Sequence, residues 1–232
     1  MIKFPGSILI MRFAQRWQFI RSPLTLFATS VVLLGLFASL VAADDDEAWR
    51  ELFDGKTLQD WTATNFGGEG KVEIDAGRIV LGFGSDLTGI TWKGPMPRVD
   101  YEVKLEARRE EGSDFFCGLT FPVNDSFCSL ILGGWGGTVV GLSSIDGLDA
   151  SENETSQLMN FDLNKWYAVS LKVTRQKIEA WIDGSKIIDQ ELAGRKINIR
   201  PEVELSRPFG FASWRTRGAL RKIAMRKIDT RR

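Results

Sequence analysis

The sequence predicts an all-β fold in which two antiparallel sheets pack face to face as a sandwich. Two runs of alternating apolar and polar residues between 166 and 182 are typical of strands with one buried face, and a third run begins at Lys186-Ile187-Ile188. Asp183-Gly184 separates the second run from the third and supplies the positive φ angles of a tight hairpin. No convincing amphipathic helix follows residue 43, so a second sheet is the expected cover for the apolar face of this meander.

Strict alternation also predicts a strand at 101–108, where the apolar residues from Tyr101 to Ala107 fall on one parity and charged residues on the other. Further strands, bounded by turn signals, are expected at 72–75, 78–81, 115–121, 127–132 and 209–214. Residues 90–92 lie between two predicted loops, and the basic segment 220–228 closes the domain. The total of roughly ten to twelve strands, with no internal repeat and no linker, predicts one domain over residues 44–232.

Three segments are predicted to be irregular. Residues 133–137 are four glycines around Trp135, which is typical of a bend or of an open surface where a ligand approaches the backbone. Residues 143–160 are a long polar loop. Residues 202–204 follow Pro201 and are predicted to be a loop or an edge strand.

Residues 1–43 predict an export signal. An uncharged, mostly apolar run at 24–43 follows a basic segment and ends in Val41-Ala42-Ala43, which fits cleavage after Ala43. The run is also just long enough to span a bilayer as a helix, so a cleaved signal peptide and an uncleaved signal anchor both stay open. In either case the folded part is expected in the periplasm, at the cell surface or secreted.

Charge and composition exclude several classes of function. The chain has 30 basic and 30 acidic residues, and residues 1–43 carry four of the basic ones and no acid, which leaves 30 − 4 = 26 basic against 30 acidic residues. This balance does not predict nucleic-acid binding. Histidine is absent, which excludes Ser-His-Asp and Cys-His nucleophile systems and histidine-ligated metals. A catalytic base must therefore be a carboxylate, a lysine or a tyrosine.

The two cysteines, Cys117 and Cys128, fall on the two strands of an expected hairpin. In an oxidising compartment they can form a disulfide if they face each other across it. Two buried free thiols are the alternative, because a register shift of one residue turns the side chains to opposite faces.

Four segments of the chain resemble the 3-keto-disaccharide hydrolase family of the concanavalin A-like lectin and glucanase superfamily. They are the opening 52–61 (LFDGKTLQDW), 100–107 (DYEVKLEA), 166–184 and the closing 209–228. The resemblance covers essentially all of the chain after residue 43 and implies a jelly-roll sandwich that cleaves glycosidic bonds of 3-keto-disaccharides. The family's "NSGIFFR" segment corresponds to 112–119 without its arginine, and the acid of its "GEWN" is replaced by Asn164-Lys165.

Ordinary retaining glucanase chemistry is not predicted, because the E-x-D-x-x-E motif that places two carboxylates on one strand is absent. Cleavage of a 3-keto sugar needs less. The ketone acidifies the hydrogen at C2, so one base and one cation or donor that stabilises the enolate are sufficient. Asp114 and Arg215 are the predicted catalytic pair, since each flanks a strand whose counterpart in the family that the chain resembles lies near the concave sheet.

Tryptophans are the predicted sugar-binding residues, because indole faces stack on the C–H faces of sugar rings. The candidates are Trp92, Trp135, Trp181 and Trp214. Core packing is the alternative for Trp214. No cofactor is predicted; the acids Asp146, Asp149, Glu152 and Glu154 offer a calcium alternative, although their spacing matches no EF-hand.

The expected ligand is a mono- or oligosaccharide, and a membrane contact is expected only through an uncleaved N-terminal segment. The alternative function is a non-catalytic carbohydrate-binding or cell-surface module on the same fold. A purely structural envelope protein is a third class.

Overall fold

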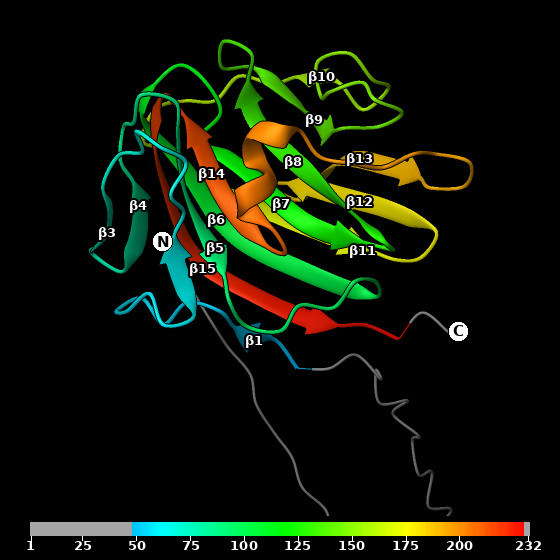
Figure 1. Cartoon of the computed structure of the whole chain (residues 1–232), viewed down its shortest axis with the longest axis horizontal. Helices are drawn as coiled ribbons and strands as arrows, with labels where there is room; N and C mark the ends of the chain where they lie inside the picture. The colour runs from blue at the N-terminus through cyan, green and yellow to red at the C-terminus, as the bar shows by residue number, and fades with distance from the viewer. Residues whose placement is uncertain (1–47, 230–232) are drawn as a thin grey trace, which may run out of the picture. The chain divides into compact units, whose positions relative to one another are not determined.

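The computed structural model describes residues 48–229, which form two antiparallel β-sheets with a single 3-10 helix, η1 (Pro201–Ser206), among the described residues (Figure 1). Both the all-β class and the two-sheet arrangement predicted from the sequence are confirmed. Alternating residues of each strand point into the space between the sheets, and these residues make up the main hydrophobic core.

Sheet A contains eight strands. Their order is β13 (Ser185–Glu191), β12 (Lys177–Ile182), β11 (Tyr167–Val173), β6 (Tyr101–Gly112), β15 (Thr216–Lys227), β4 (Arg78–Leu81) and β3 (Val72–Asp75), with β1 (Arg50–Glu51) paired to β15.

Sheet B contains seven strands. Their order is β10 (Gln157–Leu158), β9 (Val139–Ser143), β8 (Ser126–Gly134), β7 (Cys117–Val123), β14 (Gly210–Trp214), β5 (Leu87–Trp92) and β2 (Trp61–Ala63).

The predicted meander is β11, β12 and β13, and its second turn has φ angles of 49° at Asp183 and 79° at Gly184. Strand β6 alternates as predicted: Tyr101 and Val103 are fully buried and Leu105 is 3% exposed. The strong period-two pattern of these strands was a reliable predictor because each has one face in the core and one toward solvent.

Strand β5 differs from the prediction, because all six of its residues are buried. Its outer face is covered by η1, where the Thr91 hydroxyl donates to Leu205 O at 2.9 Å. On the inner face Trp92 is 1% exposed and packs against Trp61 with ring centroids 5.0 Å apart. The prediction that Trp92 contacts a sugar is therefore corrected: it is a core residue.

The cysteine hairpin forms as β7 and β8, but the cysteines are not opposite each other. Cys117 pairs with Leu132, and Cys128 pairs with Phe121. Both thiols are free and buried in the core. Burial raises the pKa of each thiol from 9.0 to about 12. Of the two alternatives, the structure supports two buried thiols.

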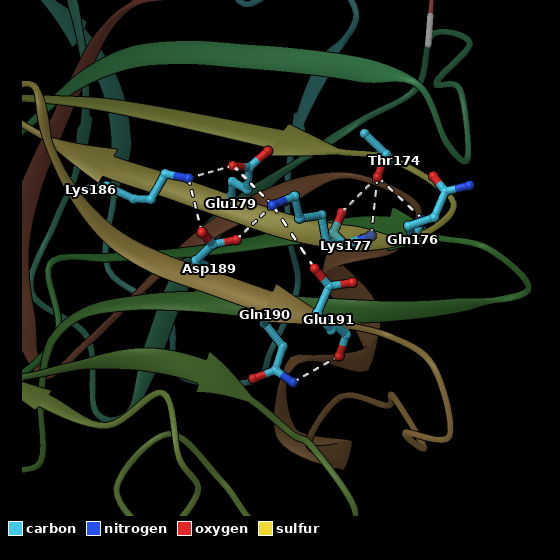
Figure 2. Close-up of polar contacts among 8 residues, drawn as sticks. All are labelled: Thr174, Gln176, Lys177, Glu179, Lys186, Asp189, Gln190 and Glu191. Atoms are coloured by element: carbon cyan, nitrogen blue, oxygen red, sulfur yellow. Dashed lines mark hydrogen bonds and ion pairs between the residues drawn. The ribbon is translucent and has the colours of Figure 1, made fainter. Parts of the chain in front are cut away.

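The outer face of sheet A carries ion pairs. Along β6, Glu102 pairs with Arg226 and Glu106 with Arg221, in both cases with 2.6 Å between nitrogen and oxygen. At the β12–β13 end, Lys177 and Lys186 both reach Glu179 and Asp189 (Figure 2). These charges lie on a solvated face, as their parity in the sequence indicates.

The predicted signal or anchor segment and the proposed cleavage site lie outside the described residues. Among residues 48–229, no helix has the length and apolar character needed to cross a membrane.

Candidate functional site

A pocket of about 240 Å³ lies on the outer face of sheet B. Residues of β5, β8, β9 and β14 line it, and Glu202 and Val203 of η1 form one side. In Figure 1, η1 (orange) lies in front of sheet B, next to β14 and β8. Since core residues such as Leu119 and Phe211 occupy the inner parity of sheet B, only the alternate residues of its strands face the pocket.

Three hydroxyl side chains on adjacent strands, Thr120, Ser129 and Ser143, form a row on the outer face of sheet B, which we call the hydroxyl row, and it reaches one end of the pocket floor. Thr120 pairs in register with Ser129, and Ser129 pairs with Ser143. The hydroxyls of Thr120 and Ser129 are 2.9 Å apart and hydrogen-bonded. Ser129 and Ser143 line the pocket. The Ser143 hydroxyl is buried and has no hydrogen-bond partner within the described part of the chain.

The other end of the pocket is aromatic and apolar. Trp135 is 41% exposed, and Trp214 and Leu87 lie in the same lining. Phe115 also lines the pocket, and its ring lies so close to Gly118 that a Cβ there would be 3.1 Å from it. Gly118 therefore allows the Phe115 ring to lie flat against β7.

Asp114 contributes a carboxylate to this aromatic end. Its Oδ1 accepts a hydrogen bond from the Phe115 amide at 2.7 Å, and its Oδ2 accepts one from the Gly136 amide at 3.3 Å. Its own amide donates to the Thr216 hydroxyl at 3.0 Å. The carboxylate is thus fixed between the start of β7 and the loop of residues 133–137, which we call the Trp135 loop.

Arg200 and Glu202 contribute an ion pair. Ser144 and Asn198 exchange backbone hydrogen bonds of 2.6 and 3.2 Å, which brings the segment before η1 alongside the end of β9. The Arg200 guanidinium bonds to Glu202 at 2.8 Å and also to Asp149. The hydrogen bond from Arg200 lowers the pKa of Glu202, and the same bond raises the pKa of Arg200. The pocket therefore holds a fixed cation beside an ionised carboxylate.

The family model described as 3-keto-alpha-glucoside-1,2-lyase-like domain matches residues 48–229. The chain belongs to this family. A search of curated proteins found no match.

Solved structures show similarity to this 3-keto-alpha-glucoside-1,2-lyase-like domain in the fold. A candidate glycosyl hydrolase from Parabacteroides distasonis is 16% identical with a TM-score of 0.51, over 78% of this chain and 95% of that one. A galectin-like protein of unknown function from Bacillus subtilis is 11% identical with a TM-score of 0.55, over 79% and 97%. The Crh5 transglycosylase in complex with NAG is 10% identical with a TM-score of 0.53, over 79% and 84%.

The pocket brings together three of the residues predicted from the sequence: Asp114, Trp135 and Trp214. Arg215 is not in the lining. Its guanidinium donates to Asp86 at 2.7 Å and to Ser85 O at 3.0 Å, so the predicted pair of Asp114 and Arg215 does not form.

Trp181 is likewise outside the pocket. It lies on the outer face of sheet A, where the Lys186 ammonium is 5.3 Å from the centre of its ring. The sequence correctly placed Trp181 on the strand face opposite to the core, but that face of sheet A points away from sheet B.

Sequence reasoning missed Arg200, Glu202, Ser129 and Ser143. The signal for the two serines was available, because each sits on the outward parity of an otherwise apolar strand. Arg200 and Glu202 gave no such signal, since η1 has neither a strand nor an α-helical period.

Three of the four acids of the 143–160 loop are paired with arginines. Asp146 and Glu154 both pair with Arg195, and Asp149 pairs with Arg200. Within residues 48–229 no group of three acidic or cysteine side chains has the spacing of a metal site.

Proposed function

We propose that this domain binds one sugar unit in the pocket of sheet B and cleaves the glycosidic bond of 3-keto-glycosides by elimination. Family membership supports the reaction class. The observation that carries the proposal is the joint presence of Asp114, Arg200 and two indoles in one pocket. At about 240 Å³ the pocket lies below the roughly 300–1,000 Å³ of drug-sized ligand sites, which favours a single ring over a longer oligosaccharide.

In the proposed reaction, the Asp114 carboxylate removes the proton at C2, which the neighbouring ketone has acidified. The C1–C2 double bond forms as the C1–O bond breaks, and the glycosidic oxygen leaves with the electron pair and takes up the proton from Asp114, which is then ionised again. Water then adds to the unsaturated sugar to complete net hydrolysis. Arg200 supplies the positive charge that stabilises the enolate oxygen, the role that the sequence analysis gave to Arg215.

The binding role is assigned to Trp135 and Trp214. Trp135 is exposed at the pocket edge and Trp214 forms part of the lining, so both offer an indole to the C–H face of a sugar ring.

A non-catalytic carbohydrate-binding or cell-surface module is the second candidate. It is favoured by the hydrogen bonds that Asp114 accepts from the amides of Phe115 and Gly136, because these give the carboxylate a structural role as well. It is also favoured by the pairing of Arg200 with two acids, which partly neutralises the cation.

We also propose that the domain formed by residues 44–232 is exported, with residues 1–43 as signal peptide or anchor. Sequencing the N-terminus of the protein from fractionated cells tests this. A start at Asp44 supports cleavage, and a membrane-bound chain that retains residues 24–43 supports the anchor. Recovery of the protein in the cytoplasm contradicts export.

The enzymatic proposal is tested by incubating the purified protein with 3-keto-trehalose and with unoxidised trehalose. We expect turnover of the keto sugar only. Asp114→Asn is expected to lower kcat by at least about 100-fold while binding changes little, since it removes the base and keeps the shape.

The matched control is Asp86→Asn, which removes an acid from the Arg215 ion pair outside the pocket and is expected to leave kcat unchanged. Saturable binding without turnover supports the module instead. Equal turnover by wild-type protein and Asp114→Asn refutes Asp114 as the base.

A further inference from the structure

We propose that the hydroxyl row is a polar subsite, in which Ser143 hydrogen-bonds a ring hydroxyl of a terminal sugar unit and so determines which sugars the pocket accepts. This inference deepens the proposed function and rests on the pocket being a sugar site.

The register of the strand pairing aligns the three side chains of the hydroxyl row across neighbouring strands. The residues paired across β7, β8 and β9 put three hydroxyls side by side on the pocket face. Two residues along each strand, at the next position on the same face, the row changes to Gly118, Ile131 and Gly141. The floor is therefore polar at one end and apolar in the middle, with the aromatic end beyond.

Ser143 is the member of the row with capacity for a ligand. The Ser129 hydroxyl is already engaged with Thr120, whereas the Ser143 hydroxyl is unpartnered although the residue is only 1% exposed. A buried polar group without a partner costs free energy, so its presence at the lining of a pocket indicates a partner that arrives with the ligand.

The arrangement defines the chemical class of the ligand. A pyranose has an apolar C–H face and a polar edge of hydroxyls, and the pocket offers indoles at one end and hydroxyls at the other. The volume and the side formed by η1 restrict the pocket to one unit. The subsite thus selects a terminal sugar unit with a free hydroxyl on the edge opposite Trp135.

Ser213 provides a matched control within the same sheet. It is also 1% exposed, and its hydroxyl also has no partner among the described residues. However, Ser213 shares the parity of the core residue Phe211, so its side chain lies on the inner face. The two serines have equal burial and opposite orientation.

The experiment measures binding of methyl 3-keto-α-glucoside and of its 4-deoxy and 6-deoxy forms by calorimetry, in the full chain carrying Asp114→Asn to prevent turnover. Ser143→Ala is expected to weaken binding of the parent sugar by roughly 2- to 10-fold, the effect of one neutral hydrogen bond. Ser213→Ala is expected to leave it unchanged. One deoxy sugar is expected to bind the Ser143→Ala protein as well as the parent does.

Thermal unfolding separates this role from a structural one. Neither alanine variant removes a hydrogen bond of the free protein, so both should keep or raise the unfolding midpoint. Equal affinity of Ser143→Ala and Ser213→Ala for the parent sugar overturns the subsite while leaving the proposed function intact. Absence of saturable sugar binding by the protein with Ser143 intact overturns both. Loss of binding in Ser143→Ala without turnover by wild-type protein supports the subsite and contradicts only the lyase activity.

Discussion

At the scale of single residues, Arg109 explains how a loop of glycines holds a tryptophan in place. Its side chain points inward from β6 and is 6% exposed. The guanidinium donates to Gly133 O at 3.2 Å and to Gly137 O at 2.8 Å, which are the two ends of the Trp135 loop. It also lies 5.2 Å from the ring centre of Phe116.

Burial lowers the pKa of Arg109, and the nearby Asp114 carboxylate opposes that change. The guanidinium keeps its charge at neutral pH, because arginine titrates above about pH 12 and is not deprotonated in proteins. Arg109 therefore links the Trp135 loop electrostatically to Asp114, although Arg109 itself does not line the pocket.

We predict that Arg109→Met lowers the free energy of unfolding by about 2–4 kcal/mol, because two carbonyls lose a charged donor. It should also weaken sugar binding several-fold by releasing Trp135. Urea unfolding and calorimetry measure the two effects.

Trp135→Ala distinguishes positioning from general loosening. If Arg109 acts through Trp135, adding Arg109→Met to Trp135→Ala lowers stability further but does not weaken binding further. Fully additive losses of affinity contradict the positioning role.

At the scale of elements, the two outer sheet faces have different chemistry. Sheet B leaves a pocket of hydroxyls and indoles, whereas sheet A is covered by ion pairs. At the edge of sheet A, the Lys177 and Lys186 side chains bridge β12 and β13 through Glu179 and Asp189, as Figure 2 shows. Charges on an edge strand also disfavour pairing with a second chain.

The pKa of Asp189 is lowered by hydrogen bonds from Lys177 and then Lys186, and the pKa of each lysine is raised in turn. A lowered carboxyl pKa stabilises the fold above its unfolded value of 3.8, and this contribution is lost as the pH falls through the folded value.

We predict that Lys177→Met with Lys186→Met lowers the unfolding midpoint at pH 7, because Glu179 is 8% exposed and loses both cations. The difference from wild type should shrink below about pH 4, where the acids become protonated. Lys56→Met with Lys196→Met makes the same change of net charge on exposed loops and should have little effect. A deficit that does not shrink at all as the pH is lowered from about 4 to about 2 argues against the ion pairs as its cause.

At the scale of the whole molecule, burial in the core raises the pKa of three groups that ionise in alkali. They are Cys117, Cys128 and Tyr101, and burial raises the pKa of each, to about 12 for the two thiols. A raised pKa means that the fold keeps its full stability below the unfolded value, here 9.0 for the thiols. The contribution is then lost as the pH rises toward 12.

We predict that the free energy of unfolding falls between pH 9 and 12 by up to about 1.4 kcal/mol per pH unit for each thiol. Native protein at pH 8 should not react with a thiol reagent except through unfolding. Replacement of both cysteines by Ala should reduce the alkaline loss to the part caused by Tyr101. Rapid labelling of both thiols in the native protein contradicts the buried placement.

The sequence predicted the parts of this molecule in which one strand face is buried and the other solvated. Strands β6 and β11 follow that rule, and so does Trp181. The sequence-based prediction failed at β5. A strand buried on both faces shows no alternation of apolar and polar residues, so Trp92 was wrongly assigned to ligand binding. Arg200 was out of reach for another reason, because its position depends on the pairing of Asn198 with Ser144 across the fold.

Strand β15 ends the described domain, and it lies inside sheet A, with β6 on one side and β4 on the other (Figure 1). Its far end also holds β1, through the pair Arg50 and Met225. Until these twelve residues leave the ribosome, the sheet exists as two unconnected pieces with open edges. Folding of this domain therefore requires β15, and a stop codon before Thr216 should leave a chain that proteases degrade.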